Sequence, residues 1–477
     1  MIENDTNRKN TMQTNTNQEY TEAGNADRFM NENRGNLLYS KALGWLVWNG
    51  QKWAEGDGME AHVKNEVNDF TRKMLVDATR QQMEAAAVGD VPEKVKKAVQ
   101  NAFRCRKDST IKAIISLAQA GLYKSAKAFD ADPDMLNTPG GIVNLRTGEV
   151  SPHDKEAYCT KITKYAPSDE GRQEWAQFVN MVCCDDPDLV CYLQTVIGCS
   201  LFGIVLTEGL YIATGEGWNG KSTFFNAIRI ALGDYAGTID SEILTTNAQG
   251  KDAKTAALRG KRLIVCGELP EGARLSESTV KRITSTDNIQ INRKFKDAEE
   301  ITPSHSICLH TNNLPRITAT DQGTWRRIHL VPFNATMPKG NANIVNYAEV
   351  LAKRCGGAII AWAIEGAMYC AANNFQIEEV AAIRDLTMRY RSGQNQVENF
   401  INEFCIIDPT AEESAGNLYN AYKAYCCQFD ERPKRQDAFI EDVKRLGYRK
   451  RAANGHTNVW QGLVINPAKI AVDRSTP

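Results

Sequence analysis

The sequence lacks a cysteine pattern typical of a metal site. None of its 13 cysteines forms a C-x-x-C pair, and it contains only six histidines. Because structural zinc sites draw on closely spaced cysteine and histidine ligands, a structural metal is not expected. The odd number of scattered cysteines, and the lack of a secretion-signal pattern near the start, predict reduced thiols in a cytoplasm.

An excess of either charge is also missing. Lysine and arginine number 57 against 58 aspartates and glutamates, which gives a formal net charge of -1. This balance excludes a globally basic nucleic-acid coat. It leaves open DNA binding through a local basic patch or through a ring of subunits.

The chain has no long apolar run without polar interruptions. The most apolar window, residues 189–207, contains Gln194, Thr195 and Ser200, and a second window, residues 358–372, contains Glu365. Both windows predict buried helices, so a membrane partner is not expected. Residues 1–34 are rich in Asn, Thr, Gln and Glu, and this composition predicts a disordered leader.

The length of 477 residues exceeds what one hydrophobic core organises, and four segments are expected. The leader is followed by a mixed α+β segment over residues 35–167. Residues 168–392 alternate short apolar strands with helical stretches, which is typical of a parallel sheet covered on both faces. Residues 393–477 combine helices with a hairpin over residues 448–465, and this order favours a winged-helix domain. The predicted fold class is α/β.

One motif dominates the third segment. Eight consecutive residues fit the phosphate-loop pattern G-x-x-x-x-G-K-[ST], namely Gly215, Glu216, Gly217, Trp218, Asn219, Gly220, Lys221 and Ser222. An apolar run precedes them and a helical stretch beginning at Thr223 follows. A strand, a glycine loop and a helix in this order aim backbone N–H groups and the positive end of a helix at one point. The motif predicts a triphosphate site that includes Thr223, with Lys221 on the β/γ-phosphates and the Ser222 hydroxyl on Mg²⁺.

The same letters also fit the dinucleotide fingerprint G-x-G-x-x-G. Its glycines would be Gly215, Gly217 and Gly220, and Asp240 lies 20 residues further on, where that motif places its ribose-binding acid. A dinucleotide loop has no need of a lysine and a hydroxyl directly after its third glycine. Lys221 therefore favours the phosphate loop.

Hydrolysis requires further groups, and candidates lie at the ends of predicted strands. Glu268 follows the strand at 263–266, Asn312 follows the strand at 307–310, and Arg326-Arg327 precede the strand at 328–331. They offer a carboxylate for Mg²⁺ and water, a polar sensor, and a cation for transition-state charge. Singly, each is also typical of a loop acid, a turn former or a solvated surface charge. Their order along the chain favours a catalytic series.

This ordered series resembles superfamily 3 helicases of the phage and plasmid primase-helicase branch. The matching stretches are the phosphate loop and residues 262–269, 311–315 and 323–328. Residues 283–287 and 292–296 are similar to the family's DNA-contacting hairpin motif. Residues 135–149 are similar to its helicase-associated amino-terminal domain, and residues 418–422 with 460–462 to its carboxyl-terminal winged-helix domain.

The resemblance implies an AAA+-type ATPase domain over residues 168–392, within a homo-hexameric ring. In such a ring Arg327 or Arg326 reaches the γ-phosphate held by a neighbouring subunit. ATP and Mg²⁺ are the implied cofactors, with Ser222 and Glu268 at the metal. Single-stranded and forked DNA, and host or phage replication proteins, are the implied partners, in a bacterial host cytoplasm.

The expected function is therefore an ATP-dependent DNA helicase for the replication of a phage or mobile element. One alternative is a replication initiator or loader ATPase without processive unwinding. Another is a phosphate-loop kinase or metabolic NTPase, which would not be stimulated by single-stranded DNA.

DNA contacts are expected at two places. The first mixes cations with an aromatic ring, as single-strand sites do, and consists of Arg293, Lys294, Phe295 and Lys296. The second lies at the start of the predicted wing and consists of Arg449, Lys450 and Arg451. Both stretches are also typical of solvated hairpins.

Overall fold

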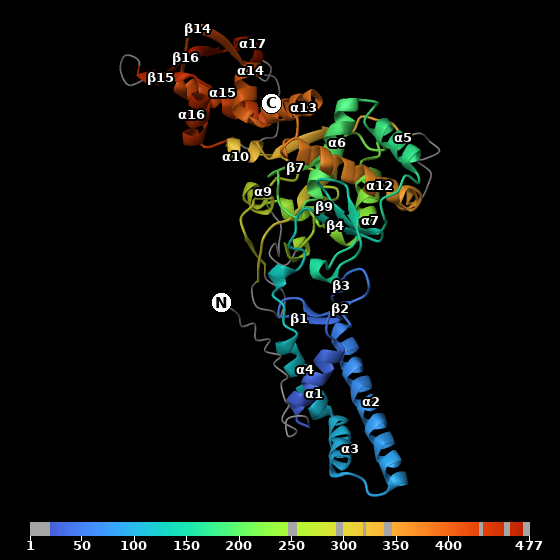
Figure 1. Cartoon of the computed structure of the whole chain (residues 1–477). Helices are drawn as coiled ribbons and strands as arrows, with labels where there is room; N and C mark the ends of the chain where they lie inside the picture. Colours follow the sequence, from blue (N-terminus) through green and yellow to red (C-terminus); the bar gives the residue numbers. More distant parts are fainter. Residues whose placement is uncertain are drawn as a thin grey trace, which may run out of the picture.

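A computed structural model describes residues 20–246, 255–291, 299–317, 321–337, 346–428, 433–452 and 458–470. The chain begins with helices and a small sheet, continues through a five-stranded parallel sheet, and ends in a second helical unit with its own sheet (Figure 1). The parallel sheet carries the phosphate loop, and its surroundings position the site.

The N-terminal region is built around helices that pack side by side. Its elements are α1 (Glu22–Glu32), β1 (Leu37–Ser40), β2 (Gly44–Trp48), β3 (Trp53–Ala54), α2 (Met59–Val88), α3 (Glu93–Cys105) and α4 (Asp108–Gly121). The strands form one antiparallel sheet in the order β1-β2-β3. Figure 1 shows α2 and α3 extending away from the parallel sheet.

Helix α1 corrects the prediction of a disordered leader up to residue 34. Thr21 caps the helix by accepting a hydrogen bond from the N–H of Gly24 at 3.1 Å. Ala26 and Phe29 are three residues apart on one helix face and are buried, with Phe29 edge-on against Phe70 of α2. The average composition is polar, but this apolar spacing suffices to dock a short helix on α2 and α4.

A second antiparallel sheet links this region to the core. It consists of β4 (Met135–Thr138), β5 (Gly141–Asn144) and β6 (Val150–Ser151), in that order. A single-turn helix, η2 (Lys155–Ala157), follows.

The core sheet has five parallel strands in the order β13-β7-β12-β9-β8. The strands are β7 (Leu210–Thr214), β8 (Ala236–Ile239), β9 (Leu263–Cys266), β12 (Ser306–Thr311) and β13 (Ile328–Pro332). Their side chains alternate between two hydrophobic clusters, so that Tyr211 faces one and Ile212 the other. The predicted parallel sheet, covered on both faces, is confirmed, while β8 was not predicted.

Helices cover both faces of this sheet. One face packs on α5 (Arg172–Val182), α6 (Pro187–Ser200), α7 (Lys221–Leu232) and α12 (Tyr347–Ala372). The other packs on α9 (Glu277–Thr284), α10 (Gln322–Trp325) and part of α13 (Ala381–Gln394). A short hairpin, β10 (Ile289–Ile291) and β11 (Glu299–Ile301), leads from α9 into β12.

Helix α12 is the one helix in the described ranges whose length and composition would suffice to cross a membrane. It is packed within the core, against α5, α6 and α7. Its backbone comes so close to α6 that a Cβ on Gly198 would lie 2.1 Å from the carbonyl carbon of Gly366. The prediction of a buried helix over residues 358–372 is confirmed.

A disulfide joins Cys199 of α6 to Cys370 of α12. The prediction that all thiols are reduced was therefore wrong for this pair. The other eleven cysteines are free. The two bonded residues are 171 positions apart, and only the close crossing of the two helices brings them together.

The C-terminal region has its own hydrophobic cluster and its own sheet. Its elements are α14 (Gln396–Phe404), β14 (Cys405–Ser414), α15 (Ala415–Gln428), α16 (Gln436–Arg445), β15 (Arg449–Ala452), β16 (Asn458–Ile465) and α17 (Pro467–Ile470). The strands pair antiparallel in the order β14-β16-β15. The predicted hairpin is confirmed in its two strands, and its turn at Asn454-Gly455 lies outside the described residues.

Candidate nucleotide site

The phosphate loop connects the carboxyl end of β7 to the first residue of α7. Gly217 and Gly220 adopt positive φ angles of 81° and 82°, where a side chain would be strained. A Cβ on Gly220 would also lie 2.6 Å from a methyl group of Val182. No side chain caps the N-terminus of α7. The first N–H groups of a twelve-residue helix therefore point at the loop without a capping side chain, as an anion site requires.

Lys221 is held in the centre of this loop. Its side chain is buried, with the whole residue 4% exposed. The ammonium group donates to the carbonyl oxygen of Gly215 at 2.9 Å, to Oδ1 of Asn219 at 2.8 Å and to Oδ1 of Asn312 at 2.8 Å. Burial lowers the pKa of Lys221, and the nearby carboxylate of Glu268 acts in the opposite direction. A buried cation with these partners is poised to exchange them for phosphate oxygens.

Glu268 and Asn312 meet beside the lysine because β12 lies between β7 and β9. Oε2 of Glu268 accepts from the backbone N–H of Asn312 at 3.0 Å and from the hydroxyl of Thr311 at 3.3 Å. The strand ends place the carboxylate and the amide at the same edge of the sheet as the loop. The structure thus brings together Lys221, Glu268 and Asn312, which are far apart in sequence.

A cavity of about 360 Å³ opens at this edge. Seven of its lining residues belong to the loop and the first turn of α7, and the other five are Glu268, His310, Asn312, Met337 and Tyr347. Sequence reasoning missed His310, Met337 and Tyr347. His310 could have been noticed as the last apolar-strand position before Asn312, whereas Met337 and Tyr347 carry no sequence signal. Burial lowers the pKa of His310, with Glu268 raising it and Lys221 lowering it further.

The residues at this edge fit a nucleotide with a divalent cation. The exposed Ser222 hydroxyl and the Glu268 carboxylate both line the cavity, and oxygen ligands of these two kinds are those that Mg²⁺ takes in phosphate-loop sites. Trp218, at positive φ and 74% exposed, presents a ring at the rim. The cavity can therefore hold a polyphosphate against the loop and place a carboxylate and an amide near its outer end.

Arg326 and Arg327 do not belong to this cluster. They precede β13, at the amino edge of the sheet, and both form ion pairs with Glu208. Arg327 is 8% exposed, and its guanidinium donates to Oε2 of Glu208 at 2.6 Å and to the carbonyl oxygen of Gly323 at 2.7 Å. Five residues of β13 separate it from the loop edge, roughly 17 Å along the strand. Neither arginine reaches the phosphate loop of its own chain.

The structure describes one of the two stretches that were predicted to contact DNA. Arg293, Lys294, Phe295 and Lys296 lie outside the described residues. Arg449, Lys450 and Arg451 lie on the edge strand β15, where Arg449 and Arg451 are exposed. Arg451 already pairs with Glu412 of β14 at 2.6 Å. Arg449 is thus the exposed cation of that strand without an ion pair in the described residues, and Lys450 is half-buried.

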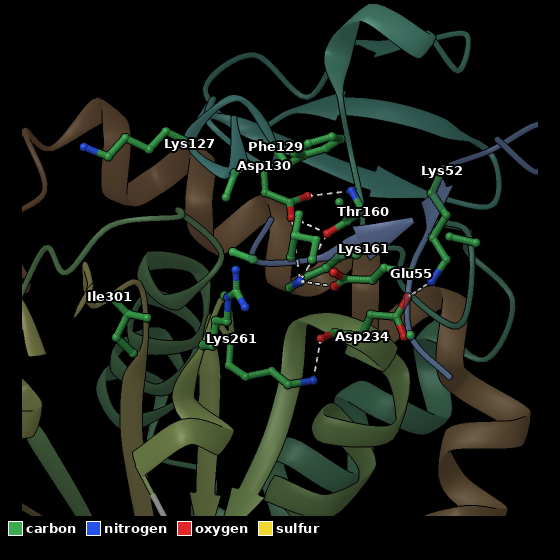
Figure 2. Close-up of a pocket in the computed structure, with 18 of the residues that line it drawn as sticks. Lys52, Glu55, Lys127, Phe129, Asp130, Thr160, Lys161, Asp234, Lys261 and Ile301 are labelled. Atoms are coloured by element: carbon green, nitrogen blue, oxygen red, sulfur yellow. Dashed lines mark hydrogen bonds and ion pairs between the residues drawn. The ribbon is translucent and has the colours of Figure 1, made fainter. Parts of the chain in front are cut away.

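A second, larger cavity of about 1300 Å³ lies at the amino edge of the sheet (Figure 2). Its walls combine the β1-β2-β3 region with Asp234 and Lys261 of the core, and the base of the β10–β11 hairpin closes it. It is a junction between two parts of the chain that are far apart in sequence.

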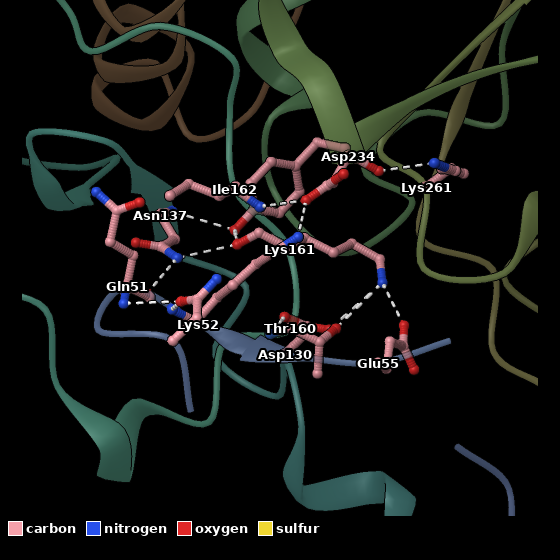
Figure 3. A network of polar contacts seen from close by, with 12 residues as sticks. Gln51, Lys52, Glu55, Asp130, Asn137, Thr160, Lys161, Ile162, Asp234 and Lys261 are labelled. Atoms are coloured by element: carbon pink, nitrogen blue, oxygen red, sulfur yellow. Dashed lines mark hydrogen bonds and ion pairs between the residues drawn. The ribbon is translucent and has the colours of Figure 1, made fainter. Parts of the chain in front are cut away.

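Lys52, Lys161 and Lys261 of this junction contact acidic residues or their backbone (Figure 3). Nζ of Lys161 lies 3.8 Å from Glu55 and 3.6 Å from Asp130, and Lys52 pairs with Asp234. Lys261 donates to the backbone oxygen of Asp234 at 2.8 Å, and its pKa is lowered chiefly by burial. These contacts tie the N-terminal region to the core, and the paired charges leave no evident excess for an anionic ligand.

Two family models match the chain. Residues 26–184 match "D5 N terminal like", and residues 213–327 match "Family of unknown function (DUF5906)". The second match spans the phosphate loop, Glu268, Asn312 and Arg327.

Viral proteins are the relatives found. A "Putative helicase L207/L206" of Acanthamoeba polyphaga mimivirus is 24% identical over 309 residues, which covers 61% of this chain and 32% of the relative. A "Putative primase C962R" of African swine fever virus is 21% identical over 328 residues, covering 63% and 33%. The chain thus spans about a third of the length of these relatives.

Among solved structures, the C-terminal region of NrS-1 has a TM-score of 0.46 at 10% identity and covers 93% of this chain and 99% of that one. Together, the two family models and the viral relatives show that the chain is similar to phage-type primase-helicases.

Proposed function

We propose that the protein is an ATP-dependent DNA helicase of superfamily 3 that acts in the replication of a phage or mobile element. The observation that carries this proposal is the contact of Lys221 with Asn312, beside Glu268, at the edge of a parallel sheet. A lysine, an acid and an asparagine that follow the ends of three neighbouring strands supply the groups that phosphate transfer to water requires. The names of the viral relatives support replication as the setting.

The roles of the residues follow from their positions. Lys221 and the N-terminus of α7 bind the β- and γ-phosphates, and Ser222 and Glu268 hold Mg²⁺, which screens the phosphate charge when bound. Glu268 also polarises the attacking water, and Asn312 orients it. The Glu268 carboxylate is itself fixed by Thr311 and the Asn312 N–H, so its direction is set before nucleotide arrives.

The proposal includes a homo-hexameric ring with an AAA+-type core. The arginine pair supports this part, because Arg327 is too far from its own loop to act there. In a ring, Arg327, or Arg326, leaves Glu208 and stabilises charge on the γ-phosphate of the neighbouring subunit. An arginine acting in this way is worth about 10³–10⁵ in rate.

DNA binding is proposed at the β10–β11 hairpin and at the C-terminal region. The order helix, strand, two helices and hairpin in α14–β16 supports a winged helix, with Arg449 and Lys450 on its wing. Single-stranded and forked DNA are the proposed ligands, and their binding is expected to stimulate ATP turnover.

The decisive experiment measures ATPase activity with and without single-stranded DNA, followed by strand displacement on a forked substrate. Wild-type protein is expected to hydrolyse ATP faster with DNA and to displace the strand, and Lys221→Ala is expected to do neither. DNA-stimulated ATPase without displacement would favour the initiator or loader alternative. An ATPase rate that is the same with and without single-stranded DNA would favour a metabolic NTPase and overturn the proposal.

A further inference from the structure

Helix α3 carries an unusual outward face. Its inward face is marked by Val99, Ala102 and Cys105, which are buried. At about 100° per residue, six exposed residues fall within about 120° of one another on the opposite side. They are Glu93, Lys96, Lys97, Gln100, Phe103 and Arg104, and Lys107 is the second residue after the end of the helix. Figure 1 places this helix on the part of the N-terminal region that extends away from the parallel sheet.

The charged residues of α3 are mostly positive, whereas arginines on the neighbouring helix α2 are paired with acids. On α2, Arg72 pairs with Asp69 and Arg80 with Asp77. Within α3 itself the only acid is Glu93 at the first turn, 4.0 Å from Lys96. Among the residues that the structure describes, Lys97 and Lys107 have no ion-pair partner. In a chain of net charge -1, α3 is a concentrated positive patch.

The aromatic residue on this face narrows the class of ligand. Phe103 is 60% exposed and lies between Lys96 and Lys107 in sequence. An exposed ring among exposed cations, of which Lys97 and Lys107 have no ion-pair partner in the described residues, is the combination that binds a phosphodiester backbone while stacking on a base. A purely solvated face needs no aromatic side chain, and an apolar protein partner would not favour the lysines.

We propose that the outward face of α3 is a nucleic-acid binding site, distinct from the β10–β11 hairpin and from the C-terminal region. It takes the phosphodiester backbone of DNA, with Lys96, Lys97, Arg104 and Lys107 on phosphates and Phe103 against a base. This extends the helicase proposal by adding a contact outside the ATPase core, and it rests on that proposal only for the identity of the nucleic acid as DNA.

The spacing of the cations fits such a backbone. Lys96 and Arg104 are eight residues apart, which is about 12 Å along the helix axis. Phosphates of one strand of B-DNA advance by about 3.4 Å per nucleotide along the duplex axis, so a protein helix lying along that axis spans about three to four of them. Arg104 also donates to Oδ1 of Asn101 at 3.0 Å and to the carbonyl oxygen of Tyr20, which hold its guanidinium in place.

The test compares two double variants of the full chain with the same change in charge. Lys97→Gln with Lys107→Gln removes two cations from the face, and Lys73→Gln with Lys353→Gln removes two exposed lysines from α2 and α12. Fluorescence anisotropy with a duplex and with a poly-dT strand measures affinity across a salt series. The first variant is expected to lower the salt slope for duplex by about 1.8 and the affinity at about 0.1 M salt about sixtyfold.

A third variant separates the two forms of DNA. Phe103→Ala is expected to weaken poly-dT binding about fivefold or more, because a stacked base is lost, and to leave duplex binding unchanged. Loss of duplex affinity alone in the lysine variant would assign the face to duplex, and loss of poly-dT affinity to single strands. Either result supports the site.

The inference is overturned if the Lys97/Lys107 variant and the Lys73/Lys353 control bind both DNAs equally well. A changed oligomeric state with unchanged DNA affinity would also overturn it, by assigning the face to protein contact. DNA-independent ATPase is recorded for every variant. Normal ATPase with unchanged DNA affinity in the Lys97/Lys107 variant refutes the site and leaves the helicase proposal standing. If the wild-type protein has no ATPase activity and the Lys97/Lys107 variant loses DNA affinity, the binding site is supported and the helicase proposal is refuted.

Discussion

Replacing Asn312 with alanine should change nucleotide binding and hydrolysis in opposite directions. The Lys221 ammonium has three donors, and all three are in use, on Gly215, Asn219 and Asn312. A phosphate oxygen must therefore displace at least one partner. The Asn312 side chain is the exposed one of the three and the one that does not belong to the loop. We expect it to be the partner that yields.

The size of the effect follows from that one hydrogen bond. A hydrogen bond to a charged group contributes about 1.5–3 kcal/mol when buried, and the exposure of Asn312 reduces this to about 1 kcal/mol. Asn312→Ala removes the competing acceptor, so the affinity for a nonhydrolysable ATP analogue should rise about fivefold. The same change removes the group that orients water, and kcat should fall about 10²-fold or more.

Two measurements decide the outcome. Calorimetric titration with the analogue gives Kd, and steady-state kinetics give kcat for the same preparation. Asn313→Ala is the matched control, because Asn313 is adjacent and exposed but does not line the cavity. If Asn312→Ala weakens binding and hydrolysis together, the side chain holds the nucleotide and our account of its competition with phosphate is wrong.

Three further outcomes are expected. Arg327→Ala and Lys221→Ala should each lack ATPase activity. Mixing the two proteins should restore part of the activity, because a Lys221→Ala subunit supplies the arginine to a neighbour whose phosphate loop is intact. No recovery of activity would contradict an arginine acting in trans. Burial lowers the pKa of His305 to about 4. Below about pH 6.5 the unfolded state therefore binds a proton at this histidine while the folded state does not. The free energy of unfolding should fall by about 2 kcal/mol between neutral pH and about pH 5 for this reason. His305→Gln should reduce the drop in Tm between neutral pH and about pH 5, and an unaltered drop would refute this source. Gly198→Ala should lower the stability of the protein by about 1–3 kcal/mol or more, because the new Cβ would clash with the backbone of Gly366. Gly393→Ala is the control, because its Cβ would have no atom within 4 Å, and it should not destabilise the protein in this way. Equal Tm values for the two variants in thermal unfolding would exclude the close helix crossing.

Four of the five core strands were predictable because each is a short, largely buried run with a glycine loop or polar turn near its end. The apolar run before the phosphate loop is an example, and it forms β7. Strand β8 was not predicted because Ala236–Ile239 contains a glycine and a threonine and resembles a loop. Helix α2 was not predicted because its buried residues form only a narrow stripe in a polar stretch. Within the core sheet, local patterns therefore predict a strand where most of its residues are buried.

The site was predictable residue by residue, but its contacts were not. Lys221, Glu268 and Asn312 each follow or open an element whose pattern is clear in sequence. Their meeting depends on β12 lying between β7 and β9, although β9 precedes β12 in the chain. The partners of Arg327 could not be foreseen either, because Glu208 precedes β7 without any motif. Strand order and loop partners are set by tertiary packing, which local sequence patterns do not record.

Strand β12 gives the proposed helicase a direct path from nucleotide to DNA. Its carboxyl end carries Thr311 and leads into Asn312, which touches Lys221, and its amino end begins four residues after the β10–β11 hairpin. Six residues of strand span about 20 Å without a flexible joint. A displacement of Asn312 on phosphate binding would therefore reach the amino end of β12 along one strand, and residues 302–305 connect that end to the hairpin base. In the proposed ring, the arginine pair at the amino edge of the same sheet would link this displacement to a neighbouring subunit.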